Sequence, residues 1–188
     1  HACFTNAVTL GASPSGGLTK TGAGTLTLAC ANTFAGAVVV EGGTLKVAAD
    51  GALPAKAPVS VAPGATLDLN GRALAATALG TTGGAVVNGT LTLPSALAVD
   101  LAEAKRGNCP TFAGGAFAFP EGATLTLAHA DVRDARDRFY TLFKVTGAGT
   151  LTGTPTFVAA DDLAPWTLVN TGRELRLAFP AGSVFILR

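Results

Sequence analysis

The string GTLTL at residues 24–28 sets the architecture of this chain, because near copies of it recur along the sequence. From the first Thr of one copy to the matching position of the next, the steps are 19, 22, 24, 34, 26 and 24 residues. A step near 22 residues accommodates about three short strands and their corners, which is one turn of a parallel β-solenoid. The later copies in chain order are Gly43-Thr44-Leu45-Lys46-Val47, Ala65-Thr66-Leu67-Asp68-Leu69, Gly89-Thr90-Leu91-Thr92-Leu93, Ala123-Thr124-Leu125-Thr126-Leu127, Gly149-Thr150-Leu151-Thr152 and Arg173-Glu174-Leu175-Arg176-Leu177.

Apolar and polar residues alternate strictly within each copy. Leu26 and Leu28 point to one side of an extended strand, and Thr25 and Thr27 point to the other. If successive copies stack about 4.8 Å apart, their apolar residues form one internal ladder and their threonines coat the outside. The expected ladder consists of Leu26, Leu28, Leu45, Val47, Leu67, Leu69, Leu91, Leu93, Leu125, Leu127, Leu151, Leu175 and Leu177.

A second strand is expected between the copies, for example at Val38-Val39-Val40 and at Val59-Ser60-Val61. Turn signals such as Glu41-Gly42-Gly43 and Asn88-Gly89 separate these strands. We therefore predict an all-β fold, a right-handed parallel β-solenoid (β-helix) of about six to seven coils. A β-sandwich is the alternative, but its hairpins favour steps of about 8–12 residues.

The 188 residues fit a single domain, 1–188. We expect residues 1–15 to form an N-terminal cap or an added strand, and residues 178–188 to form a C-terminal strand or tail. The long step and a charged run interrupt the repeat, which predicts short loop insertions near 103–116 and 129–138.

Composition excludes several classes of function. The net charge is +1, with 13 basic and 12 acidic residues, so the basic surface that nucleic-acid binding requires is missing. Hydrophobic residues make up 48% of the chain, but the uncharged stretch at 73–99 is interrupted throughout by Thr, Gly and Asn. A membrane-spanning helix, which needs about twenty consecutive apolar residues, is therefore not predicted.

Three cysteines, Cys3, Cys30 and Cys109, match neither a zinc-binding nor a CxxC spacing. Buried, inert thiols are one interpretation. A Cys3–Cys30 disulfide is the other, because these two residues lie roughly one repeat apart. Cys109 would then be unpaired or would bridge to another molecule.

Residues 16–47, GGLTKTGAGTLTLACANTFAGAVVVEGGTLKV, resemble the autotransporter-associated β-strand repeat, also called the passenger-associated transport repeat. The matching motif runs from Gly16-Gly17-Leu18 and Lys20 through Asn32-Thr33 to Gly43-Thr44-Leu45 and Val47. Phe34 stands where the family usually has Tyr, and Cys30 replaces a small residue. The resemblance implies a secreted or surface-exposed β-helical passenger or stalk, with this chain as its C-terminal part.

No constellation of residues indicates catalysis. The acidic residues are dispersed, apart from Asp131, Asp134 and Asp137, which interleave with arginines, and the pair Asp161-Asp162, which is typical of a polar turn. We predict no catalytic residue, no cofactor and no metal site. The aromatic residues expected to be exposed, where they could stack on sugars, are Trp166, Tyr140 and Phe112.

The function expected from these patterns is structural. We expect a non-enzymatic extracellular segment of a surface fibre, stalk or adhesin, located outside the cell or on its surface. Open strand edges at the ends would allow end-to-end stacking into a filament. The expected partners are other copies of the chain or upstream repeats of the same chain, with surface glycans as a further possibility. The alternatives are a carbohydrate-binding module and a polysaccharide-degrading β-helix enzyme.

Overall fold

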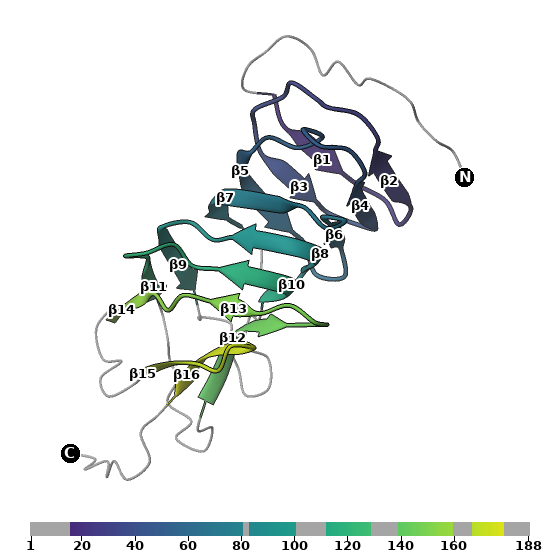
Figure 1. Cartoon of the computed structure of the whole chain (residues 1–188). Helices are drawn as coiled ribbons and strands as arrows, with labels where there is room; N and C mark the ends of the chain where they lie inside the picture. Colours follow the sequence, from purple (N-terminus) through teal and green to yellow (C-terminus); the bar gives the residue numbers. More distant parts are fainter. Residues whose placement is uncertain (1–15, 81–82, 101–111, 129–138, 160–166, 179–188) are drawn as a thin grey trace, which may run out of the picture.

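A computed structural model describes residues 16–80, 83–100, 112–128, 139–159 and 167–178 (Figure 1). Every regular element in these ranges is a β-strand, which confirms the predicted all-β class. This part of the chain has no helix with the length and apolar character that a membrane span requires. The strands form one large sheet and one three-stranded sheet.

The described residues form sixteen strands, most of them short. In chain order they are β1 (Leu18–Lys20), β2 (Thr25–Leu28), β3 (Val38–Val40), β4 (Thr44–Val47), β5 (Lys56–Val61), β6 (Thr66–Asp68), β7 (Ala73–Leu79), β8 (Ala85–Thr92), β9 (Ala96–Asp100), β10 (Phe112–Ala118), β11 (Thr124–Ala128), β12 (Phe139–Val145), β13 (Leu151–Thr152), β14 (Thr156–Ala159), β15 (Thr167–Asn170) and β16 (Glu174–Ala178).

The longest stack of parallel strands, called ladder A here, contains β2, β4, β6, the first half of β8, the first half of β10 and the end of β12. Each return of the chain to ladder A begins a new layer. One column of side chains runs through all of these strands. In order it consists of Leu26, Leu45, Leu67, Val86, Gly114 and Val145.

Two further sets of parallel strands belong to the large sheet. Ladder B joins β1, β3 and the second halves of β5 and β7, and it buries alternate valines such as Val38 and Val59. Ladder C joins the first halves of β5 and β7 to the second halves of β8 and β10 and to β13. Its inward column consists of Leu74, Leu91, Phe117 and Leu151.

The smaller sheet contains β9, β11 and β14, again in parallel. Leu97, Leu125 and Phe157 form its central column. Figure 1 shows these three strands to the left of β8, β10 and β13. No described strand pairs the smaller sheet to the large one, so the two sheets do not close into one continuous wall.

The corner between ladders A and C shortens over four successive layers and then lengthens again. It takes residues 48–55 in one layer, 69–72 in the next, then only Asn88-Gly89 and then Gly115, whereas residues 146–150 form the corner between β12 and β13. The two shortest corners lie inside continuous strands, β8 and β10. Asn88 bends β8 by adopting a left-handed backbone with φ of 53°.

The shortening corners change where the repeated strings lie. Only the first three copies, at Leu26, Leu45 and Leu67, occupy one column of ladder A. Leu91 lies in ladder C and Leu125 in the smaller sheet. Val86 occupies the place in ladder A that the repeat assigned to Leu91, because the chain reaches ladder A before the fourth copy begins. The expected single ladder is therefore divided among several.

The parallel stack ends in an antiparallel pairing. β16 lies antiparallel to both β12 and β15, with Leu175 opposite Phe143. The last copy of the repeat, at 173–177, is thus half of a hairpin with β15 rather than a further parallel layer. Leu175 and Leu177 are nevertheless fully buried, because alternation along the strand still directs them inward.

The side chains of the core change character along the stack. Leu and Val fill the upper layers, whereas Phe143 in the lower layers contacts Phe112, Phe117 and Phe119 with ring centroids 4.9–5.4 Å apart. Gly114 leaves a gap in the ladder A column, and the ring of Phe117 fills it: a Cβ on Gly114 would lie 2.6 Å from Phe117 Cζ. A larger ring compensates for the missing side chain.

Several predicted boundaries meet the structure only in part. The insertion expected near 103–116 is wrong for its last residues, because 112–116 belong to strand β10, which pairs with β8 and β12. Residues 103–111, the expected loop at 129–138, the N-terminal segment 1–15 and the tail 179–188 lie outside the described residues.

Candidate functional site

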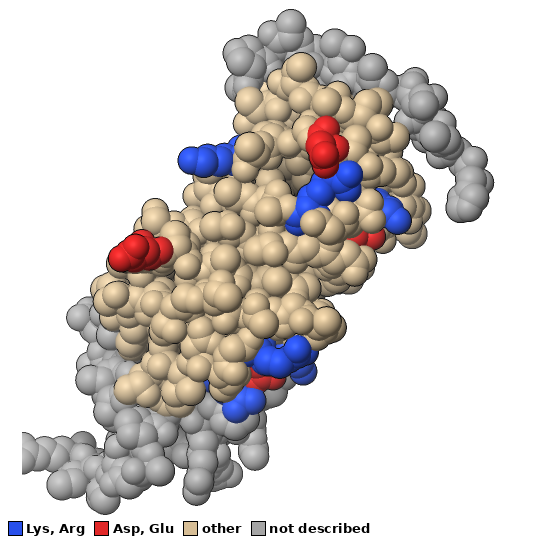
Figure 2. Space-filling model, in the orientation of Figure 1, with Lys and Arg blue, Asp and Glu red and all other residues tan. Residues whose placement is uncertain are grey.

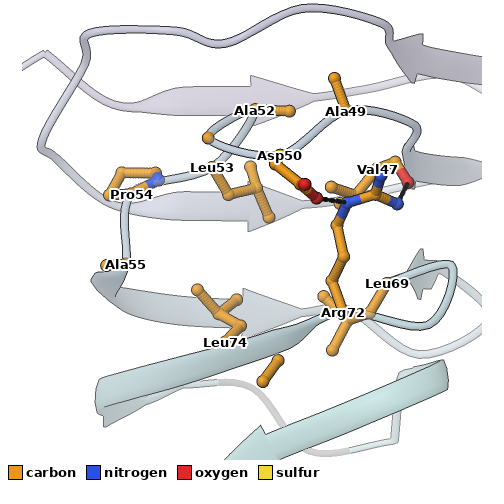
Figure 3. Close-up of a pocket in the computed structure, with 12 residues that line it drawn as sticks. Val47, Ala49, Asp50, Ala52, Leu53, Pro54, Ala55, Leu69, Arg72 and Leu74 are labelled. Carbon is orange, nitrogen blue, oxygen red and sulfur yellow. Dashed lines mark hydrogen bonds and ion pairs between the residues drawn. The ribbon is translucent and has the colours of Figure 1, made fainter.

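A notch forms where the corner between ladders A and C first shortens. The eight-residue corner at 48–55 overhangs the four-residue corner at 69–72, and the two enclose a pocket of about 340 Å³ (Figure 3). Leu53 and Leu74 lie on opposite walls, one from the overhanging corner and the other from β7. The apolar lining residues include Val47, Ala52, Leu53, Pro54, Leu69 and Leu74.

An ion pair spans one side of the notch. Arg72 Nε donates to Asp50 Oδ1 at 2.8 Å, and the two residues come from consecutive layers. The same guanidinium donates to the carbonyls of Val47, Ala48 and Asn70, each at 3.1 Å. The Arg72 side chain is 27% exposed, whereas that of Asp50 is 96% exposed. The cation is thus held inside the corner, and the carboxylate faces the solvent.

The overhanging corner is anchored from the layer above as well. Asn32 Nδ2 donates to the Ala52 carbonyl at 2.9 Å, and the Asn32 backbone N–H donates to the Gly51 carbonyl at 2.9 Å. Ala52 is completely buried beneath this contact. Bonds from both neighbouring layers therefore fix the upper wall of the notch.

Two more cationic side chains, Lys20 and Arg173, donate hydrogen bonds to corner carbonyls as Arg72 does. Lys20 Nζ, in a side chain that is almost fully buried, donates to the carbonyls of Thr21, Gly22 and Gly42. Arg173 donates to carbonyls at the corner of residues 145–149. Corners leave carbonyls that no strand partner satisfies, and these long cations reach them from an adjacent turn or layer.

Charge is sparse over the visible face of the molecule. Figure 2 shows the charged side chains mostly toward the two ends of the stack, and the surface over β8 and β10 is uncharged in this view. Two of the described acids are engaged locally: Asp68 Oδ1 accepts from the Asn70 N–H and from Asn88 Nδ2, and Glu174 binds Arg176. Among the described residues no group of three His, Cys, Asp or Glu is placed to hold a metal ion.

The upper edge of the stack is formed by β1 and β2, the strands of the first described layer. Within the described ranges, β1 pairs with β3 alone and β2 with β4 alone. In ladder A, the first N–H of β4, β6 and β8 donates to the layer above: Thr44 donates to the Gly24 carbonyl, Thr66 to the Gly43 carbonyl and Ala85 to the Ala65 carbonyl. The equivalent N–H of Thr25 therefore points upward from the first described layer.

The structure places the predicted ladder residues in the interior. Leu26 is partly buried in the first described layer, and the others are buried. The buried members are Leu28, Leu45, Val47, Leu67, Leu69, Leu91, Leu93, Leu125, Leu127, Leu151, Leu175 and Leu177.

The prediction of exposed aromatic rings is wrong for two of its three members. Tyr140 and Phe112 are only 6% and 7% exposed, because the alternation of β12 and β10 turns both side chains into the core. Trp166, the acidic groups Asp131, Asp134 and Asp137, and the pair Asp161-Asp162 lie outside the described residues.

The cysteine pairing stays a prediction. Cys30 is partly buried, and no described residue forms a disulfide with it. Cys3 and Cys109 lie outside the described residues.

Sequence reasoning missed the Arg72–Asp50 pair and the notch beside it. Both depend on the difference in length between two corners, and the spacing of 22 residues between the partners equals one repeat step. That equality is the signal that would have placed them side by side.

Comparisons with known proteins agree with the repeat seen in the sequence and in the ladders. The sequence model of the family described as Passenger-associated-transport-repeat matches residues 18–47, which run from β1 to the end of β4. A curated relative, the Adhesin BmaC autotransporter of Brucella suis biovar 1 (strain 1330), is 49% identical over 69 residues. The match covers 36% of this chain and 2% of that adhesin, so the chain corresponds to a small part of its relative. No solved structure matches the chain. Residues 18–47 therefore match a passenger-associated transport repeat, and the chain is similar to a small part of an autotransporter adhesin.

Proposed function

We propose that this chain is a segment of a right-handed parallel β-solenoid of about six coils, and that it acts as a stiff, non-enzymatic spacer in a secreted or surface-attached adhesin. The similarity to an autotransporter adhesin supports the location and the adhesive context. The parallel ladders support the winding, since three successive copies of the repeat lie in register on one another.

The column of Leu26, Leu45 and Leu67 carries the proposal. Leu45 and Leu67 are fully buried, and each is registered with the equivalent side chain one layer away. A layer has no separate core of its own, so each layer is stable only against its neighbours. Adding layers therefore lengthens the molecule without changing its cross-section, which is the property that a spacer needs.

The partner at the upper edge, in this proposal, is a preceding layer of the same repeat. Gly24 supports it, because glycine there has neither a positive φ nor any described atom within 4 Å of the place where a Cβ would stand. Its counterpart one layer below, Gly43, needs to be small because the turn at 22–24 lies directly on it. If another layer lay above Gly24, a turn of that layer would leave no room for a side chain at residue 24, just as the turn at 22–24 leaves none at Gly43.

The lower end of the stack, where β16 pairs with β12 and β15, is a poor surface for stacking a second chain. This favours extension of the solenoid at the upper edge alone. β16 closes part of that end in antiparallel pairing with β12 and β15, which a parallel strand of another copy would not match. A filament formed end to end remains the competing outcome, and it predicts a mass that rises with protein concentration.

The carbohydrate-binding alternative uses outward threonines and Trp166, which lies outside the described residues. Tyr140 and Phe112, the two other rings that could stack on sugars, are buried and add no support to it. A polysaccharide-degrading enzyme would need paired carboxylates, while the described Asp50, Asp68 and Glu174 each serve a local bond. The spacer is thus the function that the geometry supports best.

Layer insertion tests the proposal. Residues 44–65 make one step of ladder A, and a variant with three extra copies of this segment after residue 65 should fold and unfold cooperatively. Because layers lie about 4.8 Å apart, small-angle scattering should show a particle longer by roughly 14 Å with the same cross-section. An increase in cross-section, or a chain that loses its β-sheet circular dichroism on insertion, would contradict the spacer. Sedimentation of the unmodified chain at increasing concentration distinguishes it from the filament.

A further inference from the structure

The notch between the corners at 48–55 and 69–72 has a feature that a spacer does not require. It is a half-open, mostly apolar pocket of about 340 Å³ whose lining includes the exposed Asp50 and the largely buried Arg72. Pockets of this size, with mostly apolar walls and a few placed polar groups, are typical of sites for small organic molecules.

The geometry of the ion pair determines the charge that the notch can accept. Four of the five N–H donors of the Arg72 guanidinium are committed, one to Asp50 and three to backbone carbonyls. An anion would therefore find little hydrogen-bonding capacity there. The Asp50 carboxylate accepts one bond through Oδ1 and is 96% exposed, so its remaining lone pairs are accessible at the edge of the notch that Asp50 lines.

The side chains that line the notch indicate the chemistry of the uncharged part of the ligand. Leu53 and Leu74 face each other across the pocket, and the buried Val47 and Leu69 also line it (Figure 3). The described lining has no aromatic ring, which disfavours the stacking that sugars use. We propose that the notch binds a small organic cation, a protonated amine attached to an apolar body, with the ammonium on Asp50 and the apolar part between Leu53 and Leu74 (Figure 3).

The burial of the ligand's apolar part and the attraction of its ammonium to Asp50 contribute unequally to the affinity. Burying about 100 Å² of apolar surface corresponds to a dissociation constant on the order of 10 mM, and the exposed carboxylate adds a smaller preference of about two- to fivefold for the cation. This preference is the measurable signature of the site. It is independent of whether the chain acts as a spacer.

The probes are three molecules of one shape and different charge: phenethylammonium, 2-phenylethanol and 3-phenylpropionate. Methyl NMR of the whole chain follows Leu53 and Leu74 as reporters, with Leu125 in the smaller sheet as the control. Saturable shifts at Leu53 and Leu74 are expected with phenethylammonium. Binding should be about two- to fivefold weaker with the alcohol and weakest with the carboxylate. Equal shifts with all three probes, or no shift at either leucine, would overturn the proposal.

Two variants check the assignment of roles. Asp50→Asn retains the acceptor for Arg72 but removes the charge, and it should abolish the preference for phenethylammonium over 2-phenylethanol. Glu41→Gln removes an exposed carboxylate from a different corner and should leave that preference unchanged. If Ala55→Trp, which places a ring at the mouth of the notch, leaves binding unchanged while the melting curve is native, the molecule binds elsewhere and the site is wrong.

Discussion

Gly43 lies directly beneath Gly24: a Cβ added to Gly43 would overlap the Gly24 carbonyl oxygen and would stand 2.5 Å from the Gly22 carbonyl oxygen. The Thr44 N–H donates to the same Gly24 carbonyl at 3.1 Å. The contact and the hydrogen bond have one cause, because layers close enough for ladder bonds leave no room for a side chain where one turn lies on another.

Replacing Gly43 with Ala should therefore be costly. The substitution combines a strained φ of 64° with a backbone overlap, and we expect the free energy of unfolding to fall by about 3 kcal/mol. Gly64→Ala is the matched control, since Gly64 has a φ of 78° but open space around its Cβ position. It should lose only about 1 kcal/mol in urea denaturation. Equal losses for the two variants would show that the layers do not approach as closely as described.

Arg72 should matter more than its ion pair. Arg72→Met leaves the carbonyls of Val47, Ala48 and Asn70 without their donor, so we expect a loss of about 1–2 kcal/mol. Asp50→Asn should cost less than about 0.5 kcal/mol, because the carboxylate is exposed and surface pairs contribute little. Thermal melts of both variants, with exposed Lys56→Met as control, measure the difference. A larger loss for Asp50→Asn than for Arg72→Met would reverse the assigned roles.

The position of a leucine in the stack should set its contribution. Leu67 is completely buried between two layers, so Leu67→Ala should lower the free energy of unfolding by about 2–5 kcal/mol. Leu26 occupies the same column in the first described layer and is only partly buried, so Leu26→Ala should cost about half as much or less. Urea denaturation of the two variants tests this. Similar costs would indicate that a further layer covers Leu26 in solution.

Gly114 and Phe117 should be energetically coupled. A Cβ on Gly114 would lie 2.6 Å from Phe117 Cζ and 2.7 Å from the Val86 carbonyl oxygen, so Gly114→Ala should destabilise the fold by about 1–3 kcal/mol. Phe117→Leu creates space at the same place. In a double-mutant cycle, the pair of substitutions should cost at least about 0.5 kcal/mol less than the sum of the single ones. Strict additivity would mean that the ring does not fill the glycine gap.

The local pattern was sufficient for the strands and for the first three layers. Alternation at Leu26, Leu45 and Leu67, with turn residues at regular distance, predicted parallel copies in register, and the structure has them. It was insufficient for Leu91 and Leu125, which carry the same string but lie in other ladders. Periodicity along a strand fixes which side chains share a face, not which strand lies beside it.

Alternation, glycine placement and an ordered motif were enough to predict the all-β class, the turns and the passenger-associated transport repeat at residues 18–47. The tertiary structure alone decided the ladder to which each copy belongs, the burial of Tyr140 and Phe112, and the notch beside Arg72. These depend on how many residues each corner uses before the chain returns. Contacts between layers, rather than local preference, fix that number, since a corner is stable only when its carbonyls and side chains fit the layer next to it.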